Sequence, residues 1–230
     1  MLLHRIHLNL RCKAARRDLA DPYQMHATLC RAFFPEEIRC PPGALLWRLE
    51  PESGPKGAAR VLIQCRTTPD WSRIAVPDWL ACADPGIDLV QKLALDSLDT
   101  RRVFRFRLRA NPCKTVNGKR VGLIGADAQR DWLARKGLQH GFVLPEPLSA
   151  DYFEFQQSSK GRAYTDVRIS QEQMLTGRRN NGDPINVYSA LFEGRLHVSG
   201  VEYFKKALET GIGHGKVMGL GLLSVIPMLR

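Results

Sequence analysis

The sequence predicts an α+β protein made of two tandem ferredoxin-like domains, each with the element order βαββαβ. Segments that alternate apolar and polar residues, as strands do, are separated by segments with the periodicity of helices. The order of these segments is then repeated beyond a polar DSLDT stretch at 96–100. We therefore expect an N-terminal domain over residues 1–98 and a C-terminal domain over residues 99–230.

The first half contains one well-marked helix among its expected strands. Asp21 is a suitable N-cap, Pro22 fits the first helical position, and Pro35 ends the helix. Apolar residues at every third or fourth position give this helix a buried stripe. Strands are expected at residues 2–11, 44–50, 59–66 and 87–95, with a helical or irregular segment at 70–82.

The second half repeats this pattern with an insertion. One helix should begin at a cap formed by Asp127 and end at Gly137, and an amphipathic helix should cover residues 200–210. The polar, basic stretch 156–186 is expected as an inserted segment. Strands are expected at residues 102–109, within 141–155, at 186–199 and at 220–228.

The charge of the chain favours a polyanionic partner. Lys and Arg number 34 against 23 Asp and Glu, which gives a net charge of +11. A merely soluble basic protein fits this charge equally well. No apolar run approaches the roughly 18 residues of a membrane helix, and the charged N-terminal segment does not resemble a signal peptide. We therefore expect a cytoplasmic protein that does not contact a membrane.

The six cysteines give no sign of a metal site or a redox motif. None of them form a CxxC pair, and the gaps between them are long and irregular. In a reducing compartment they are expected to be buried thiols. The sequence therefore predicts neither a metal ion nor another cofactor.

Tyr23 and His26 are three residues apart on the first helix, so they share one face at the margin of its apolar stripe. Transesterification of RNA needs one group to take the 2′-hydroxyl proton and another to protonate the leaving 5′-oxygen. An imidazole can do either near neutral pH, and a tyrosine hydroxyl can polarise an oxygen. The spacing alone is equally typical of an ordinary surface pair.

Basic residues of the second half are candidates for contacts with an RNA backbone. Arg105, Arg107 and Arg109 alternate along one expected strand, and a flat row of guanidinium groups suits phosphates as well as a solvated sheet face does. A long basic insertion is uncommon unless it is used. The further candidates are Lys114 and, within the insertion, Lys160, Arg162, Arg178 and Arg179.

The segment GIGHGKVMGLG at 211–221 contains five glycines but fits no nucleotide-binding motif. It also runs from a helix to a strand, the reverse of a nucleotide-binding loop. Glycines allow backbone N–H groups to approach phosphates, so Gly213, Gly215 and Lys216 are candidate RNA contacts. A helix cap followed by a tight turn explains Gly211 without any ligand.

Three segments together resemble the CasE family, the CRISPR-associated endoribonucleases of the type I-E Cascade complex. They are FRLRANPCKT at 106–115, ALFEG at 190–194 and the glycine-rich segment at 211–224. The resemblance extends over nearly the whole chain, and the family's Y-x-x-H pattern on an N-terminal helix falls on Tyr23 and His26.

The resemblance implies two ferredoxin-like domains and an enzyme that binds the stem-loop of CRISPR repeat RNA. Such an enzyme cuts the precursor at the 3′ base of the stem without a metal, leaving a 2′,3′-cyclic phosphate and a 5′-hydroxyl. It stays on the RNA and joins the other Cascade subunits. By resemblance, His26 is the main acid/base group, Tyr23 assists, and Arg178 and Arg179 grip the stem. Either Lys160 or Lys216 would stabilise the charge of the transition state.

Two other functions remain open from the sequence. A non-catalytic RNA-binding subunit of a CRISPR ribonucleoprotein fits the net charge as well as a nuclease does. It has no need of His26, which is the residue that separates the two hypotheses. A nucleotide-dependent enzyme is supported only by the glycines at 211–221, whose register and context are wrong.

Overall fold

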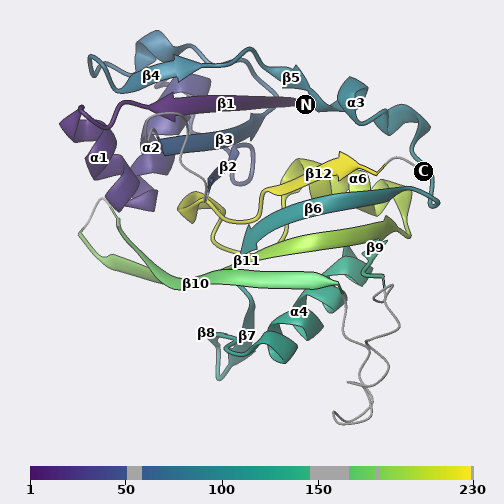
Figure 1. Ribbon diagram of the computed structural model, residues 1–230. Helices are drawn as coiled ribbons and strands as arrows, with labels where there is room; N and C mark the ends of the chain where they lie inside the picture. Colours follow the sequence, from purple (N-terminus) through teal and green to yellow (C-terminus); the bar gives the residue numbers. More distant parts are fainter. Residues whose placement is uncertain (51–58, 146–165, 180–181, 229–230) are drawn as a thin grey trace.

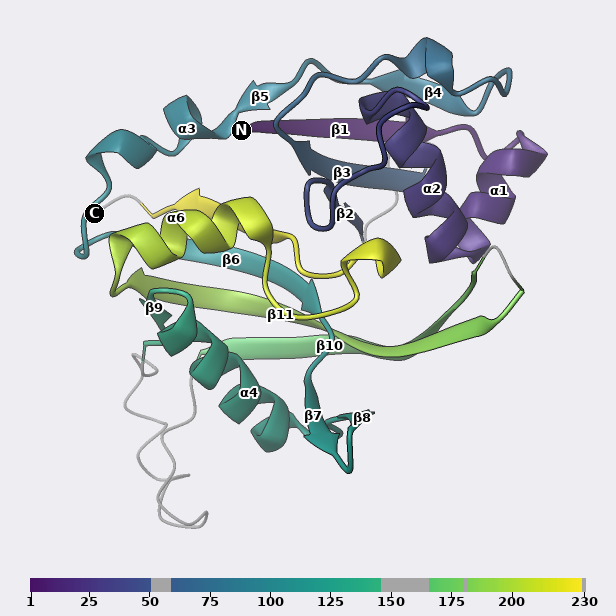
Figure 2. The same ribbon diagram turned by 180° about the vertical axis from the view of Figure 1, so that it is seen from behind.

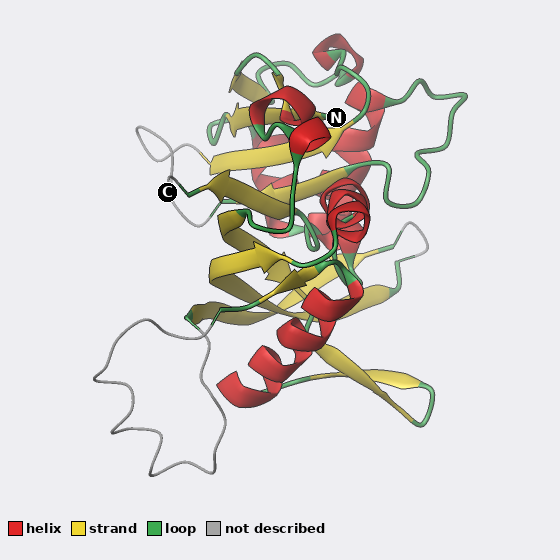
Figure 3. Ribbon diagram, turned by 90° about the vertical axis from the view of Figure 1, so that its right-hand side faces the viewer, coloured by secondary structure: helices red, strands yellow, loops and turns green. Residues whose placement is uncertain are grey.

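The computed structural model describes residues 1–50, 59–145, 166–179 and 182–228. These residues form two five-stranded antiparallel sheets, one above the other, with helices packed against them, and a separate two-stranded sheet (Figure 1). Figure 3 shows the two sheets as separate layers. Viewed from behind, α2, α4 and α6 lie in front of the sheets (Figure 2).

The first sheet has the strand order of a ferredoxin-like fold, β2-β3-β1-β4, with β5 also paired to β1. Its core contains Ile6 and Leu8 of β1 and Val61 and Ile63 of β3, all completely buried. These buried residues are two positions apart in each strand, which is the alternation from which the strands were predicted. The strands are β1 (Leu2–Leu8), β2 (Leu46–Leu49), β3 (Ala59–Cys65), β4 (Leu80–Ala83) and β5 (Ile87–Asp88).

Two helices cover this sheet, α1 (Lys13–Ala20) and α2 (Pro22–Phe33). The first of them was not expected from the sequence. It is fixed by Asp18, whose buried carboxylate accepts hydrogen bonds from Thr28 Oγ1 at 2.8 Å and from Trp79 Nε1 at 2.9 Å. Asp18 therefore joins α1, α2 and the segment before β4 through one charged acceptor.

The expected strand at 87–95 is wrong beyond its first two residues. After β5 the chain forms the short helix α3 (Leu89–Lys92) and the 3-10 turn η3 (Leu95–Ser97). Asp88 causes the change, because its side chain accepts a hydrogen bond from the Val90 backbone N–H and caps α3. The edge strand beside β1 is mainly β4 rather than the expected strand at 87–95. It follows the 3-10 turn η2 (Trp71–Arg73), in the segment expected to be helical or irregular.

The second sheet repeats the arrangement with the order β10-β11-β6-β12, and β9 pairs with β11. The fold class predicted from the sequence is therefore confirmed. The strands are β6 (Val103–Ala110), β9 (Phe142–Val143), β10 (Val167–Arg178), β11 (Pro184–Val198) and β12 (Leu223–Pro227). Helices α4 (Ala126–Gln139) and α6 (Val201–Thr210) pack on it, with Trp132 of α4 stacked on Phe192 and Phe204 of α6 stacked on Phe104.

Details of the second half differ from expectation. Asp127 lies in the first turn of α4 without capping it, and Gly137 is buried inside the helix against Phe142 rather than ending it. Leu93, Leu95 and Leu98 pack into the core of the second sheet although they precede residue 99. The division of the chain at residue 98 therefore stays a prediction.

A hairpin of β7 (Cys113–Val116) and β8 (Lys119–Gly122) was also missed. Its signal is present in the sequence as an Asn-Gly pair, the dipeptide preferred in two-residue hairpin turns. Asn117 and Gly118 both have the positive φ that such a turn requires. In Figures 1 and 2 this hairpin projects below the second sheet.

A buried ionic network joins the two sheets. The side chain of Arg48 on β2 is 1% exposed, and its Nε donates to Glu50 Oε1 at 2.7 Å. Its Nη1 donates to the backbone carbonyls of Arg107 and Leu222 at 3.0 and 3.1 Å. Arg107 of β6 completes the network, bonding Glu50 at 2.7 Å and Glu193 of β11 at 2.7 Å.

We predict that Arg48→Ala lowers the free energy of unfolding by about 3 kcal/mol, because it leaves the buried partners of the guanidinium unsatisfied. Urea unfolding followed by circular dichroism measures this as a shift in midpoint. The control is Arg73→Ala, which removes an exposed ion pair with Asp70 and should cost less than about 1 kcal/mol. Equal midpoints for the two variants would show that the network does not stabilise the fold.

Candidate functional site

Helix α2 carries Tyr23 and His26 on the margin of its buried face. Asp21 caps the helix as predicted, because its Oδ1 accepts from the backbone N–H groups of Tyr23 at 3.0 Å and Gln24 at 3.3 Å. Met25 and Leu29 are buried against the sheet and fix the rotation of the helix. Tyr23 and His26 are consequently only half-buried, as the spacing predicts.

The imidazole of His26 is half-buried beside the thiol of Cys30. Burial lowers its pKa from 6.5 to about 4. Its Nδ1 is buried without a hydrogen-bond partner in the described part of the chain. Its Nε2 lies 3.5 Å from the Sγ of Cys30, one turn further along α2. At neutral pH the ring is therefore uncharged and able to accept a proton.

The tip of the β10–β11 hairpin meets the beginning of α2. The backbone N–H of Arg178 donates to Asp21 Oδ2 at 3.2 Å, so one carboxylate holds both the helix and the hairpin. The contact is close, since a Cβ added to Gly177 would lie 3.0 Å from the Cβ of Tyr23. Arg178 and Arg179 are thus brought beside Tyr23, although they are far from it in sequence.

The expected basic insertion is wrong over residues 167–178, which form strand β10 paired with β11. Gln171 and Glu172 obscured this strand, because they lie where its pairing register shifts between Ser170 and Gln173 and the alternation of residues is interrupted. Arg178 and Arg179 therefore lie at the tip of a strand pair rather than in a long loop. Lys160 and Arg162 lie outside the described residues.

Arg105, Arg107 and Arg109 do not form the expected flat, open row of guanidinium groups. The three do alternate with buried residues, but the face opposite the core is covered by the first sheet. Arg107 is engaged with Glu50 and Glu193. Arg109 is 7% exposed and bonds Gln171, and Arg105 alone of the three is exposed.

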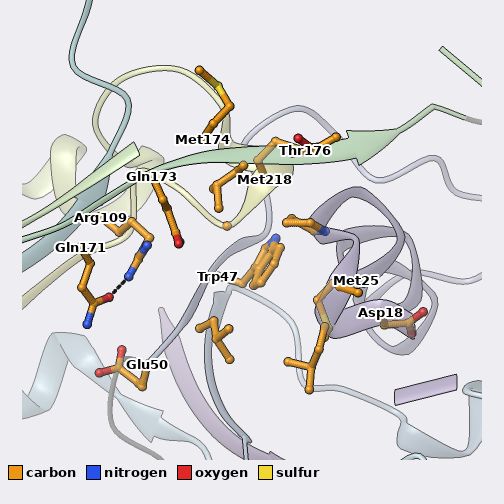
Figure 4. Close-up of a pocket in the computed structure, with 16 residues that line it drawn as sticks. Asp18, Met25, Trp47, Glu50, Arg109, Gln171, Gln173, Met174, Thr176 and Met218 are labelled. Atoms are coloured by element: carbon orange, nitrogen blue, oxygen red, sulfur yellow. Dashed lines mark hydrogen bonds between the residues drawn. The ribbon is translucent and has the colours of Figure 1, made fainter. Parts of the chain in front are cut away.

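A cavity of about 550 Å³ lies between α1, α2, β2 and β10 (Figure 4). Met25, Trp47 and Met218 form its apolar wall, and Arg109 with Gln171 lies at its other side. The described residues that line it include Pro22 but neither Tyr23 nor His26. This cavity is therefore separate from the proposed acid/base pair.

A second pocket, of about 410 Å³, lies between the β7–β8 hairpin, the β10–β11 hairpin and the glycine-rich loop. Arg120 and Arg179 line it together with His214, so one predicted RNA contact gains a second arginine as its neighbour. Arg120 was not considered from the sequence because its hairpin was missed. Lys114, on the same hairpin, is exposed.

The glycine-rich loop folds back onto β6 rather than forming an open cradle. The N–H of Gly221 donates to the carbonyl of Arg109 at 2.8 Å. Gly213 and Gly215 have φ values of +81° and +82°, which explains these glycines without any ligand. Lys216 is half-buried and reaches toward Gly43, in the loop that leads to β2. Contacts of these residues with RNA stay predictions.

None of the helices in the described part of the chain is long and apolar enough to cross a membrane.

The chain as a whole is similar to CRISPR-associated proteins. A profile of the family described as "CRISPR associated protein" matches residues 1–227. The chain is 38% identical to the CRISPR-associated endoribonuclease Cse3 of Thermus thermophilus, over 99% of this chain and 100% of that protein. It is 28% identical to the Cascade subunit CasE of Escherichia coli, over 93% of this chain and 96% of the relative.

Solved structures agree with the sequence comparisons. Cse3 bound to a 19-nucleotide RNA matches with a TM-score of 0.79 at 37% identity, over 99% of this chain and 100% of that chain. Thermus thermophilus Cse3 bound to an RNA representing a pre-cleavage complex matches with a TM-score of 0.77, over 98% of each chain. Because profile, sequence relative and structures all span nearly the whole chain, the protein belongs to the family of CRISPR-associated proteins, as its resemblance to CasE predicts.

Proposed function

We propose that this protein is a metal-independent endoribonuclease that binds the stem-loop of CRISPR repeat RNA and cuts the precursor at the 3′ base of the stem. The observation that carries the proposal is His26, an uncharged imidazole on α2 beside Tyr23, at the point where the basic hairpin tip contacts the helix. The endoribonuclease activity of Cse3, which the chain matches end to end, supports it.

The chemistry follows from the protonation state of His26. Neutral Nε2 accepts the proton of the 2′-hydroxyl, and the 2′-oxygen attacks the adjacent phosphorus. The bond from phosphorus to the 5′-oxygen breaks, and a proton delivered to that oxygen gives a 5′-hydroxyl and a 2′,3′-cyclic phosphate. Tyr23 is placed to polarise one of these oxygens. The guanidinium groups of Arg178 and Arg179 bind the phosphates of the stem.

After the cut, the protein is proposed to stay on the RNA as a Cascade subunit in antiviral defence. Two findings support this step. The relative CasE is named as a subunit of the Cascade system. The pocket between the two hairpins is lined by Arg120 and Arg179 but by neither Tyr23 nor His26, so RNA bound there does not depend on the residues proposed to make the cut.

A non-catalytic RNA-binding subunit is the second candidate, and one observation favours it. His26 Nδ1 is buried and Nε2 faces Cys30, so the imidazole is not freely open to solvent. In this hypothesis the basic hairpins bind RNA and His26 is only a packed side chain. Cleavage in the absence of metal separates the two hypotheses.

The first test is His26→Ala with a type I-E repeat stem-loop RNA in EDTA under single-turnover conditions. Losing the acid/base group should slow cleavage by about a hundredfold or more. His7→Ala, on β1, is the matched control and should cut at the wild-type rate. A 2′-deoxy nucleotide at the cut site should stop cleavage and leave binding unchanged. Wild-type cutting by His26→Ala would contradict the assigned role.

The pH dependence of kcat/KM tests the protonation state. With a pKa of about 4, His26 stays uncharged as pH falls from 7.5 to 5.5. If it is the base, kcat/KM should change by less than about twofold over this range. A base with an ordinary pKa near 6.5 would lose about tenfold. A rate that instead rises as pH falls would identify His26 as the acid.

The double variant Arg178→Ala, Arg179→Ala tests the hairpin as the stem-binding element. Affinity for the stem-loop should fall, and the slope of log K against log salt should decrease by about two. The cutting rate at saturating protein should stay within about threefold of wild type. The control is Arg101→Ala, which removes one exposed arginine before β6, at the other end of the second sheet. An unchanged salt slope in the double variant would remove the hairpin from the RNA interface.

A further inference from the structure

Three metal-ligating side chains converge around the proposed base. His26 and Cys30 are one turn apart on α2, and Cys40 comes from the loop between α2 and β2. One ligand atom from each side chain lies within 4.8 Å of the other two. Nothing in the sequence indicates this cluster, because Cys30 and Cys40 are ten positions apart and do not form a CxxC pair.

The spacing of the ligand atoms suits a zinc ion. With Zn–N and Zn–S bonds of about 2.1 and 2.3 Å, tetrahedral coordination separates nitrogen from sulfur by about 3.6 Å. His26 Nε2 and Cys30 Sγ are 3.5 Å apart. One imidazole and two thiolates form a ligand set that zinc prefers, and they leave a fourth position open.

We propose that His26, Cys30 and Cys40 bind Zn²⁺, and that the bound ion inhibits RNA cleavage by occupying the Nε2 atom of His26. The inhibition rests on the proposed role of His26 as the base, whereas the binding does not. Nδ1 of His26 is buried, so Nε2 is the ring nitrogen to which the proposed mechanism assigns the 2′-hydroxyl proton. A nitrogen lone pair that is bound to zinc cannot accept the 2′-hydroxyl proton.

The remaining cysteines provide a matched control. Cys82 on β4 is exposed and is not part of the cluster. Cys40→Ser removes one ligand from a loop without altering α2, and neither Cys30 nor Cys40 has a role in the proposed cleavage. Binding and inhibition can therefore be tested on variants that keep His26.

The experiment uses the full chain in a reducing buffer after metal has been removed with EDTA and the chelator washed away. Zinc stoichiometry is measured by competition with a chromogenic chelator, and Co²⁺ is added as a probe because thiolate ligands give it a charge-transfer absorption band. Wild type and Cys82→Ser should each bind one equivalent of zinc and show the cobalt band. Cys40→Ser and Cys30→Ser should bind zinc about a hundredfold more weakly or worse.

Cleavage of the repeat stem-loop is then measured with and without zinc. One equivalent of zinc should slow wild type and Cys82→Ser at least tenfold, and EDTA should restore the rate. Cys40→Ser should cut at the wild-type rate in EDTA and keep that rate when zinc is added. Absence of the cobalt band in wild type, or equal zinc binding by Cys40→Ser, overturns the site.

Inhibition of Cys40→Ser to the same extent as wild type overturns the inhibitory mechanism, because zinc would then act elsewhere. A different measurement, cleavage by His26→Ala in EDTA, tests the proposed function. If His26→Ala cuts like wild type in EDTA, His26 is not the base, and the zinc stoichiometry and cobalt band still report whether the site exists.

Discussion

The structure depends on the buried charges between its two sheets. Arg48 is almost completely inaccessible and bonds Glu50, while its Nη1 donates to the carbonyls of Arg107 in β6 and of Leu222 just before β12. Arg107 balances the charge of Glu50 from the opposite side. A buried pair of this kind penalises any arrangement that leaves one charge unpaired. The two ferredoxin-like units are therefore held in one orientation, and that orientation brings β10 across to the N-terminal end of α2.

At that end a single carboxylate controls the geometry of the candidate site. Asp21 accepts backbone N–H groups from its own helix and from Arg178 of the hairpin. The N-terminus of a helix favours a negative charge, so the cap is stable there and the hairpin uses the same oxygens. Arg178 and Tyr23 are thereby placed side by side. The position of the basic hairpin relative to the proposed acid/base pair is a consequence of helix capping.

The sequence predicted those features that depend on local pattern. The Asp21-Pro22 start of α2 and the alternation of β6 were predicted correctly because capping and periodicity act over a few residues. Residues far away in the sequence decide what covers the polar face of a strand. Arg107 and Arg109 were therefore expected on an open sheet face, whereas Glu50 and Gln171 bind them in the structure. Strand β10 was not predicted because its alternation is interrupted where the register shifts, at Gln171 and Glu172. The Asn117-Gly118 turn was recognisable and was overlooked.

The cluster of His26, Cys30 and Cys40 shows why composition alone is a weak guide to chemistry. Cys30 follows His26 by one helical turn, which places both on the same face whatever the rest of the fold does. Cys40 joins them only because the loop after α2 returns to begin β2. The same burial that lowers the pKa of His26 and keeps it uncharged also leaves its Nε2 facing two thiols. A neutral imidazole lone pair is what a general base needs and also what a zinc ion binds, so the proposed catalytic role of His26 and the proposed zinc site compete for the same nitrogen.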